Sequence, residues 1–204
     1  MNHSPDNSIT LAITGASGFQ YGWRLLQTLL SAGKRVYLLI SDAAFEVAEV
    51  ETDLALPRNS SELTKWLCNH LQAAEDQLIV NGLGDWNSAV ASGSGSPHSM
   101  VICPCSSGTL SAVATGAGRN LIHRAADVAI KENHQLILVP REMPLSAIHL
   151  EHMLALARLG VTIAPANPGF YHNPESIEDL IDFVVARILG QLKVPQDLLQ
   201  PWGQ

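Results

Sequence analysis

Short apolar runs alternate along the chain with longer stretches in which apolar residues recur every three or four positions. The short runs predict buried strands, and the longer stretches predict amphipathic helices. Because strands and helices alternate, we expect a parallel sheet covered by helices on both faces. The predicted strands are Ile9–Thr14, Arg35–Ile40, Gln77–Val80, Met100–Cys103, Gln135–Val139 and Val161–Ala164.

The helical stretches lie between these strands and follow the last one. Asp42 is the expected N-cap of the second helix, and Ser60 or Ser61 is that of the third. The predicted helices are Gly18–Ala32, Asp42–Glu51, Ser60–Ala73, Gly108–Thr115, Leu121–Glu132, Ser146–Leu159 and Ser176–Leu192.

These elements predict one three-layer α/β domain with a doubly wound, Rossmann-like sheet of flavodoxin or flavoprotein type, spanning residues 1–204. Residues 1–8 are expected to be a flexible N-terminus. Residues 195–204 are expected to dock on the active site or on a neighbouring subunit, because Trp202 is costly to leave in water. The Ser/Gly-rich segment Gly82–Pro97 is unusually long for a loop, and we favour a mobile cover over a site against a plain flexible loop.

Composition narrows the function. The chain is only 15% charged, below the usual quarter, so we expect either extensive contact with other subunits or a surface rich in Ser, Gly and Asn. A net charge of −7 gives no general affinity for nucleic acid or anionic membranes. No apolar stretch reaches the roughly 18 residues of a membrane span, and the N-terminus does not read as a signal peptide.

The three cysteines are Cys68, Cys103 and Cys105, an odd number without a disulfide framework, which suits a reducing cytoplasm. The spacing of Cys103 and Cys105 does not match a zinc site. His149 and His152 share a helical face, but a third ligand is not apparent, so we predict no metal.

Candidate chemistry gathers where predicted strands end, since open α/β sheets bind ligands at that edge. The turn Thr14–Gly18 carries only part of the glycine fingerprint of dinucleotide-binding sites. The other interpretation is a tight strand-to-helix connection that binds no ligand. Asp42, after the second strand, could hold a ribose or cap a helix. The fourth strand runs into small polar groups at Ser106–Thr109, which suit a phosphate or the polar edge of a ring. The fifth ends in a charged pair held between prolines, Arg141 and Glu142.

Basic residues are scarce, yet four of them fall in one stretch of the sequence: Arg119, Arg124, Lys131 and Arg141. Arg124 and Lys131 are seven positions apart and share a helical face. Beside the Gly- and Ser-rich turns, this stretch indicates a second anion site, although such a face alone is usually solvated.

An ordered set of motifs resembles the UbiX family of flavin prenyltransferases over nearly the whole chain. The motifs are TGASG, Glu51-Thr52-Asp53, CPCSSGTLSAVATGAGRNLIHRAADVAIKE, LVPREMPL, HLEHM, PGFY and FVVARIL. The resemblance implies a homododecamer that binds FMN at subunit interfaces. It implies transfer of a dimethylallyl group from dimethylallyl monophosphate to N5 and C6 of reduced FMN, without a metal. The prenylated FMN would serve a UbiD-type decarboxylase in ubiquinone or aromatic-acid metabolism.

The resemblance also implies roles for individual residues. Ser17 and Glu142 would lie near N5 and C6, and Ser17, Glu51, Lys131 and Glu142 would be catalytic. FMN would be held by Gly15, Ala16, Ser17, Ser41, Ser106, Ser107, Gly108, Thr109 and Arg141. The prenyl phosphate would be held, from more than one subunit, by Glu51, Arg124, Lys131, Tyr171 and Arg187, with Ala91 and Trp202 lining the prenyl pocket.

Three other functions compete with this one. An FMN-dependent aromatic acid decarboxylase would place a carboxylate near Arg141. A non-catalytic FMN carrier would bind flavin without turnover, which leaves the basic stretch unexplained. An NAD-dependent reductase is weakened by the incomplete glycine fingerprint.

Overall fold

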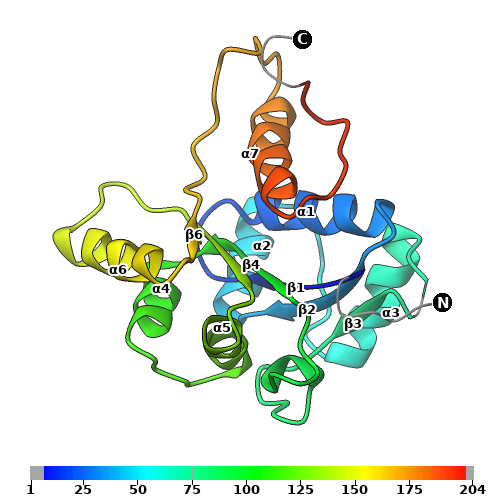
Figure 1. Cartoon of the computed structure of the whole chain (residues 1–204). Helices are drawn as coiled ribbons and strands as arrows, with labels where there is room; N and C mark the ends of the chain where they lie inside the picture. The colour runs from blue at the N-terminus through cyan, green and yellow to red at the C-terminus, as the bar shows by residue number, and fades with distance from the viewer. Residues whose placement is uncertain (1–6, 75, 201–204) are drawn as a thin grey trace.

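The computed structural model describes residues 7–74 and 76–200 and shows a six-stranded, fully parallel sheet between two layers of helices (Figure 1). The strand order is β3-β2-β1-β4-β5-β6, which confirms the predicted doubly wound α/β fold. The strands are β1 (Ser8–Ile13), β2 (Arg35–Ile40), β3 (Leu78–Val80), β4 (Ser99–Cys105), β5 (Gln135–Pro140) and β6 (Thr162–Ile163).

The strand order reverses between β1 and β4, where the chain stops adding strands on one side and starts on the other. Every residue of β1 is buried, so the strand is covered on both faces, as its apolar sequence predicts. β1 already begins at Ser8, so the N-terminal segment expected to be flexible overlaps the sheet by one residue. The reversal leaves a crevice at the carboxyl ends of the strands, the usual ligand position in such sheets.

Helices cover the two faces of the sheet as two separate hydrophobic clusters. One cluster joins α1, α2, α3 and α7 to the sheet, and the other joins α4, α5 and α6. The helices are α1 (Phe19–Ser31), α2 (Asp42–Glu51), α3 (Ser60–Leu71), α4 (Ser107–Ala114), α5 (Leu121–Lys131), α6 (Ala147–Arg158) and α7 (Ile177–Gln191).

Two of the predicted N-caps are wrong by one residue or more. Ser41, not Asp42, caps α2, because its Oγ accepts a hydrogen bond from the Ala44 N–H at 3.2 Å. Asn59, one residue earlier than expected, caps α3 through its Oδ1. Ser41 and Asn59 both have extended backbone just before the first helical turn. From there a short polar side chain can accept hydrogen bonds from the free N–H groups of that turn.

The segment Gly82–Pro97 is packed on α5, so the prediction of a mobile cover is wrong for the single chain. It contains a short 3-10 helix, η2 (Ala89–Ala91), and Val90 is fully buried against the α5 side of the core. The Leu83 carbonyl accepts the N–H of Leu121 at 2.9 Å, which ties the loop to the start of α5. A buried anchor and a main-chain bond hold this loop against its own subunit.

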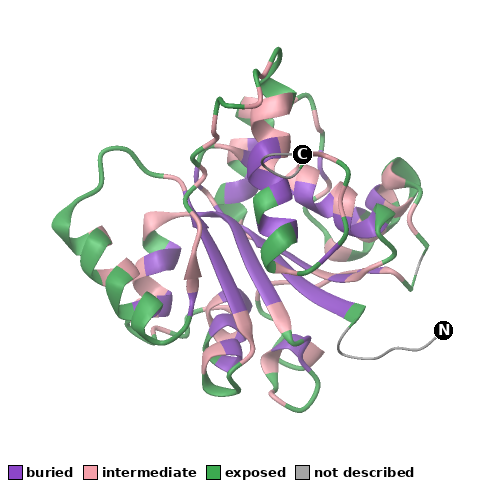
Figure 2. Ribbon diagram, turned by 45° about the horizontal axis from the view of Figure 1, so that its top comes forward, coloured by how far each residue is buried: buried purple, intermediate pink, exposed green. Residues whose placement is uncertain are grey.

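After α7 the chain folds back along α1, and Leu198 and Leu199 pack against the core. Trp202 lies outside the described residues. Helix α6, by contrast, is green along most of its length in Figure 2, because only Leu156 is buried there. Ile148, Leu150 and Leu154 are each more than half exposed, so the isolated chain leaves large apolar side chains of α6 uncovered.

Candidate functional site at the carboxyl edge of the sheet

Thr14, the residue after β1, joins the two turns at the centre of the sheet edge. Its buried hydroxyl donates to the Pro104 carbonyl at 2.8 Å and accepts the Ser106 N–H at 2.8 Å. The turn after β1 and the turn after β4 are therefore held together by one side chain. Sequence reasoning missed Thr14 as a functional residue, although a polar side chain ending an apolar strand was the available signal.

A cavity of about 480 Å³ opens beside this junction, between the starts of α2 and α4. Gly15, Ser41, Ser106, Gly108 and Thr109 line it, so five of the residues predicted to hold FMN share one cavity. Its volume falls within the range of cofactor pockets. Hydroxyls and the free N–H groups of a helix start suit the ribityl hydroxyls and the phosphate of FMN. The residues present therefore fit this flavin.

Two glycines shape the cavity. A Cβ on Gly15 would lie 2.4 Å from the Cβ of Ala43, so only glycine lets α2 begin this close to β1. A Cβ on Gly108 would meet no atom within 4 Å, because Gly108 exposes bare backbone at the first turn of α4. A ligand can thus approach the main chain closely there.

The start of α1 is already filled by a carboxylate of the protein. Glu51 Oε2 accepts the N–H groups of Gly18 at 2.8 Å and Phe19 at 3.1 Å. Burial works to raise the pKa of Glu51, but hydrogen bonds from the Ser17 hydroxyl and these N–H groups, together with Arg141, leave the pKa below its ordinary value. Glu51 is therefore charged at neutral pH and acts as a remote cap of α1.

Arg141 and Glu142 leave the sheet where β5 ends, as predicted. Arg141 Nε donates to the Ser17 carbonyl at 3.1 Å, which brings Ser17, Glu51 and Arg141 into one group above β1. Glu142 is exposed and accepts only the N–H of Met143, at 3.2 Å, among the contacts of the described residues. Its carboxylate is free to face a ligand.

Helix α5 carries Arg124 and Lys131 away from that group. Arg124 Nε donates to the Ala91 carbonyl at 3.0 Å, and its guanidinium pairs with Asp127. Lys131 pairs with Glu132 at the far end of α5, just before β5 begins. A helix of this length spans roughly 16 Å, so Lys131 lies at the amino edge of the sheet and Arg141 at the carboxyl edge.

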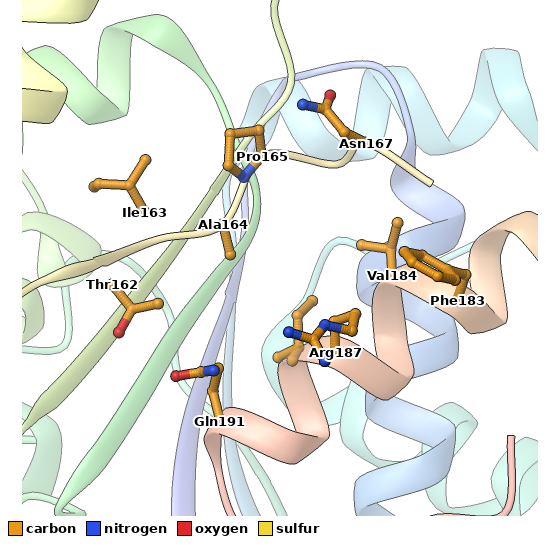
Figure 3. Close-up of a pocket in the computed structure, with 10 residues that line it drawn as sticks. Thr162, Ile163, Ala164, Pro165, Asn167, Phe183, Val184, Arg187 and Gln191 are labelled. Carbon is orange, nitrogen blue, oxygen red and sulfur yellow. The ribbon is translucent and has the colours of Figure 1, made fainter. Parts of the chain in front are cut away.

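Arg187 lines a different cavity, of about 300 Å³, between β6 and α7 (Figure 3). Figure 3 shows its side chain on the α7 side of this cavity, with Thr162 on the β6 side. Tyr171 lies on the long connection before α7, with its ring 5.5 Å from that of Phe183. Within one chain, the residues predicted to hold a prenyl phosphate are thus spread over three places: above β1, along α5, and between β6 and α7.

The other residues that line the cavity include Arg119, Asn120 and His123, to which the family resemblance gives no ligand. Arg119 and Asn120 come from the turn between α4 and α5, and His123 from the first turn of α5, which Asn120 caps by accepting the His123 N–H at 3.0 Å. The basic stretch containing Arg119 was visible in the sequence, but its position on this turn depends on how α4 ends. Among the described residues, His, Cys, Asp and Glu form no metal-binding group.

A family model described as Flavoprotein matches residues 1–189. The flavin prenyltransferase UbiX of Pseudomonas aeruginosa is 59% identical over 196 residues, which cover 96% of this chain and 94% of that protein. The chain belongs to the UbiX family of flavin prenyltransferases. A UbiX relative from Halalkalibacterium halodurans is 45% identical over the same share of this chain and 93% of its own length. The predicted family, its flavoprotein character and its transferase class are confirmed.

Solved structures of UbiX-type proteins share the fold closely. AnUbiX (PadA1), crystallised with FMN and dimethylallyl pyrophosphate, is 36% identical, with a TM-score of 0.85 and 97% of each chain covered. A dodecameric FMN-dependent UbiX-like decarboxylase from Escherichia coli is also 36% identical, with a TM-score of 0.84, covering 97% of this chain and all of that one. A search of the described helices finds none long and apolar enough to cross a membrane.

Proposed function

We propose that this protein transfers a dimethylallyl group from dimethylallyl monophosphate to N5 and C6 of reduced FMN. Identity of 59% to a flavin prenyltransferase over nearly the whole chain is the observation that carries this proposal. The polar cavity beside Thr14 supports it, because its residues fit the flavin. The product, prenylated FMN, would be released to a UbiD-type decarboxylase acting in ubiquinone or aromatic-acid metabolism. The protein would be cytoplasmic, since its free cysteines suit a reducing compartment.

The acceptor would lie against the carboxyl edge, with the cavity residues and Arg141 holding it. Arg141 is oriented by the Ser17 carbonyl, and Glu142 stands next to it without an ion pair among the described residues. Ring closure onto C6 requires that carbon to lose a proton, and Glu142 or the released phosphate would take it. Ser17 and Glu51 would keep the turn above β1 in a fixed geometry for the reaction.

The donor phosphate would be held by Glu51, Arg124, Lys131, Tyr171 and Arg187 from more than one subunit. Lys131 and Arg141 belong to opposite edges of the same sheet, so a neighbouring copy must supply one of them to a shared site. A dodecamer is supported by the dodecameric UbiX-like protein of Escherichia coli and by the exposed apolar side chains of α6. Preorganised cations would stabilise the charge of the departing phosphate, and Ala91 and Trp202 would line the prenyl pocket.

The test is incubation of the purified protein with FMN, a reductant and dimethylallyl monophosphate, with the diphosphate in a parallel reaction. We expect an altered flavin absorbance spectrum and a mass gain of one prenyl unit, from the monophosphate. A mass gain from the diphosphate alone would overturn the choice of donor. Glu142→Gln should slow product formation while FMN still binds, and Glu175→Gln, which changes an exposed carboxylate on the connection before α7, is the matched control.

The second candidate is an FMN-dependent decarboxylase of an aromatic acid, because the solved UbiX-like protein from Escherichia coli is described as an FMN-dependent decarboxylase. It predicts release of carbon dioxide from an aromatic acid by the purified protein alone. A non-catalytic carrier predicts tight FMN binding and no product in any of these reactions. The three outcomes are distinct in one set of assays.

A further inference from the structure

The turn between α4 and α5 and the first turn of α5 form one wall of the flavin cavity. Arg119 and His123 lie on this wall, and the cavity is also lined by Ser41 and Thr109. Neither residue belongs to the set that the family resemblance assigns to FMN or to the prenyl donor. Any role they have therefore concerns this chain's own side chains.

The charge of the cavity favours an anion. The chain has 19 acidic residues against 12 basic ones, yet none of the described residues that line the cavity is Asp or Glu. Arg119 is exposed, and its guanidinium forms no ion pair with any residue in 7–74 or 76–200. An unpaired guanidinium at the wall of a polar cavity is suited to bidentate binding of phosphate oxygens.

His123 supplies an acceptor on the same wall. Its ring bonds to the Ala117 carbonyl, and Nδ1 is buried without a hydrogen-bond partner in the described structure. Burial first, and then the neighbouring Arg119, lower the pKa of His123, so the ring is neutral at pH 7 and Nδ1 carries a lone pair. Buried polar atoms without partners are rare, and a ligand hydroxyl would satisfy this one.

We propose that Arg119 binds the phosphate monoester of FMN and that His123 Nδ1 accepts a hydrogen bond from a ribityl hydroxyl of the same molecule. This assignment of Arg119 to the phosphate and His123 to the ribityl chain rests on the proposed function only because it takes FMN as the ligand. Arg119 then determines the preference for FMN over unphosphorylated flavin, whereas His123 acts on both flavins. The two residues stand four positions apart across the first turn of α5, so one extended polar chain can reach both.

The test measures dissociation constants of FMN and riboflavin by flavin fluorescence with the intact protein. Arg119→Gln should weaken FMN binding by roughly 10- to 100-fold, the range for a lost hydrogen bond to a charged group, and leave riboflavin unchanged. His123→Leu should weaken both flavins by a similar factor. Arg158→Gln, which removes an equally exposed charge at the end of α6, should change neither value.

Each alternative result overturns a defined part of the proposal. Unchanged FMN binding in Arg119→Gln, with the wild type binding FMN normally, would remove Arg119 from the phosphate site. Equal weakening of FMN and riboflavin in that variant would indicate a structural role. Weaker binding of dimethylallyl monophosphate with FMN unaffected would assign Arg119 to the prenyl donor. Failure of the wild type to bind any flavin would refute the proposed function itself.

Discussion

The hydroxyl of Thr14 and the N–H of Ser106 meet at 2.8 Å, across 92 positions of sequence. This bond fixes the turn after β1 to the cap of α4, since the same Ser106 accepts the Thr109 N–H through its Oγ at 3.3 Å. The flavin cavity therefore depends on one buried hydroxyl that a ligand need not touch.

Thr14→Val should destabilise the fold by about 1–3 kcal/mol, because it keeps the shape of the side chain and leaves the partly buried N–H of Ser106 without its acceptor. FMN binding should weaken as well, since the cap of α4 shifts. Thr14→Ser retains the hydroxyl and is the matched control. Urea unfolding and flavin titration measure both effects, and equal midpoints for Thr14→Val and wild type would contradict the assignment.

Glu51→Gln tests the carboxylate that caps α1. The pKa of Glu51 is lower in the folded protein than in the unfolded chain, so its charge stabilises the fold above the unfolded value and this contribution disappears as the pH falls through the folded value. We expect a loss of about 0.3–1 kcal/mol at pH 7 and none at a pH below the folded value. Urea unfolding across this pH range checks the difference, and a constant gap between the two proteins would refute it.

Gly22→Ala should push α1 away from the sheet. A Cβ at Gly22 would lie 2.2 Å from the Cys103 carbonyl oxygen, which is main chain in the middle of β4 and cannot move aside. The expected cost is about 1–3 kcal/mol. Gly190→Ala in α7, where a Cβ meets nothing within 4 Å, should instead be neutral or stabilising. Thermal unfolding separates the two, and similar effects would show that packing at Gly22 is not limiting.

Thiol labelling should distinguish the three cysteines. Burial raises the pKa of Cys105 to about 12 and also raises that of Cys103, so both remain protonated and enclosed at pH 8. Cys68 is only half-buried. With an aromatic disulfide reagent we expect one thiol to react in the native protein and three in denaturant. Loss of the native signal in Cys68→Ser would confirm which one reacts.

Lys131→Ala and Arg187→Ala should weaken binding of dimethylallyl monophosphate by about tenfold or more while FMN binding is retained, because each removes a charge-assisted contact. Lys65→Ala, at an exposed position on α3, is the control. Calorimetry with each ligand measures both affinities. Loss of FMN with intact binding of the prenyl phosphate would reverse the proposed division between the two sets of residues.

Much of the fold could be predicted because its strands are apolar on both faces and its helices are amphipathic. β2 and α2 have the bounds that the sequence pattern indicates. The cap of α2 was misplaced because Ser41 and Asp42 are both good caps, and only the backbone angles at Ser41 decide between them. The loop at Gly82–Pro97 was misjudged because its composition is that of a flexible segment, whereas burial of Val90 depends on α5, which comes later in the chain.

The site was predictable where ligand groups follow strand ends, and less so elsewhere. Ser41 and Ser106 could be placed at one edge because parallel strands end together. The remote contact between Glu51 and Gly18 could not be predicted, since it depends on where α2 ends relative to α1. Arg119 was noted only within a basic stretch that indicated an anion site, because its position at the flavin cavity follows from a turn without a sequence signature.

The start of helix α1 is bonded to a carboxylate of the protein itself, Glu51. The electrostatic potential is therefore not uniform along the carboxyl edge of the sheet. The positive end of α1 is neutralised by Glu51, while α2 and α4 begin with neutral serine caps, Ser41 and Ser106. A molecule with one negative group therefore gains less from the start of α1 than from the start of α4, whose first turn carries no acidic residue. The orientation of such a molecule at this edge is biased by a carboxylate that is already bonded to the protein's own main chain and to a hydroxyl.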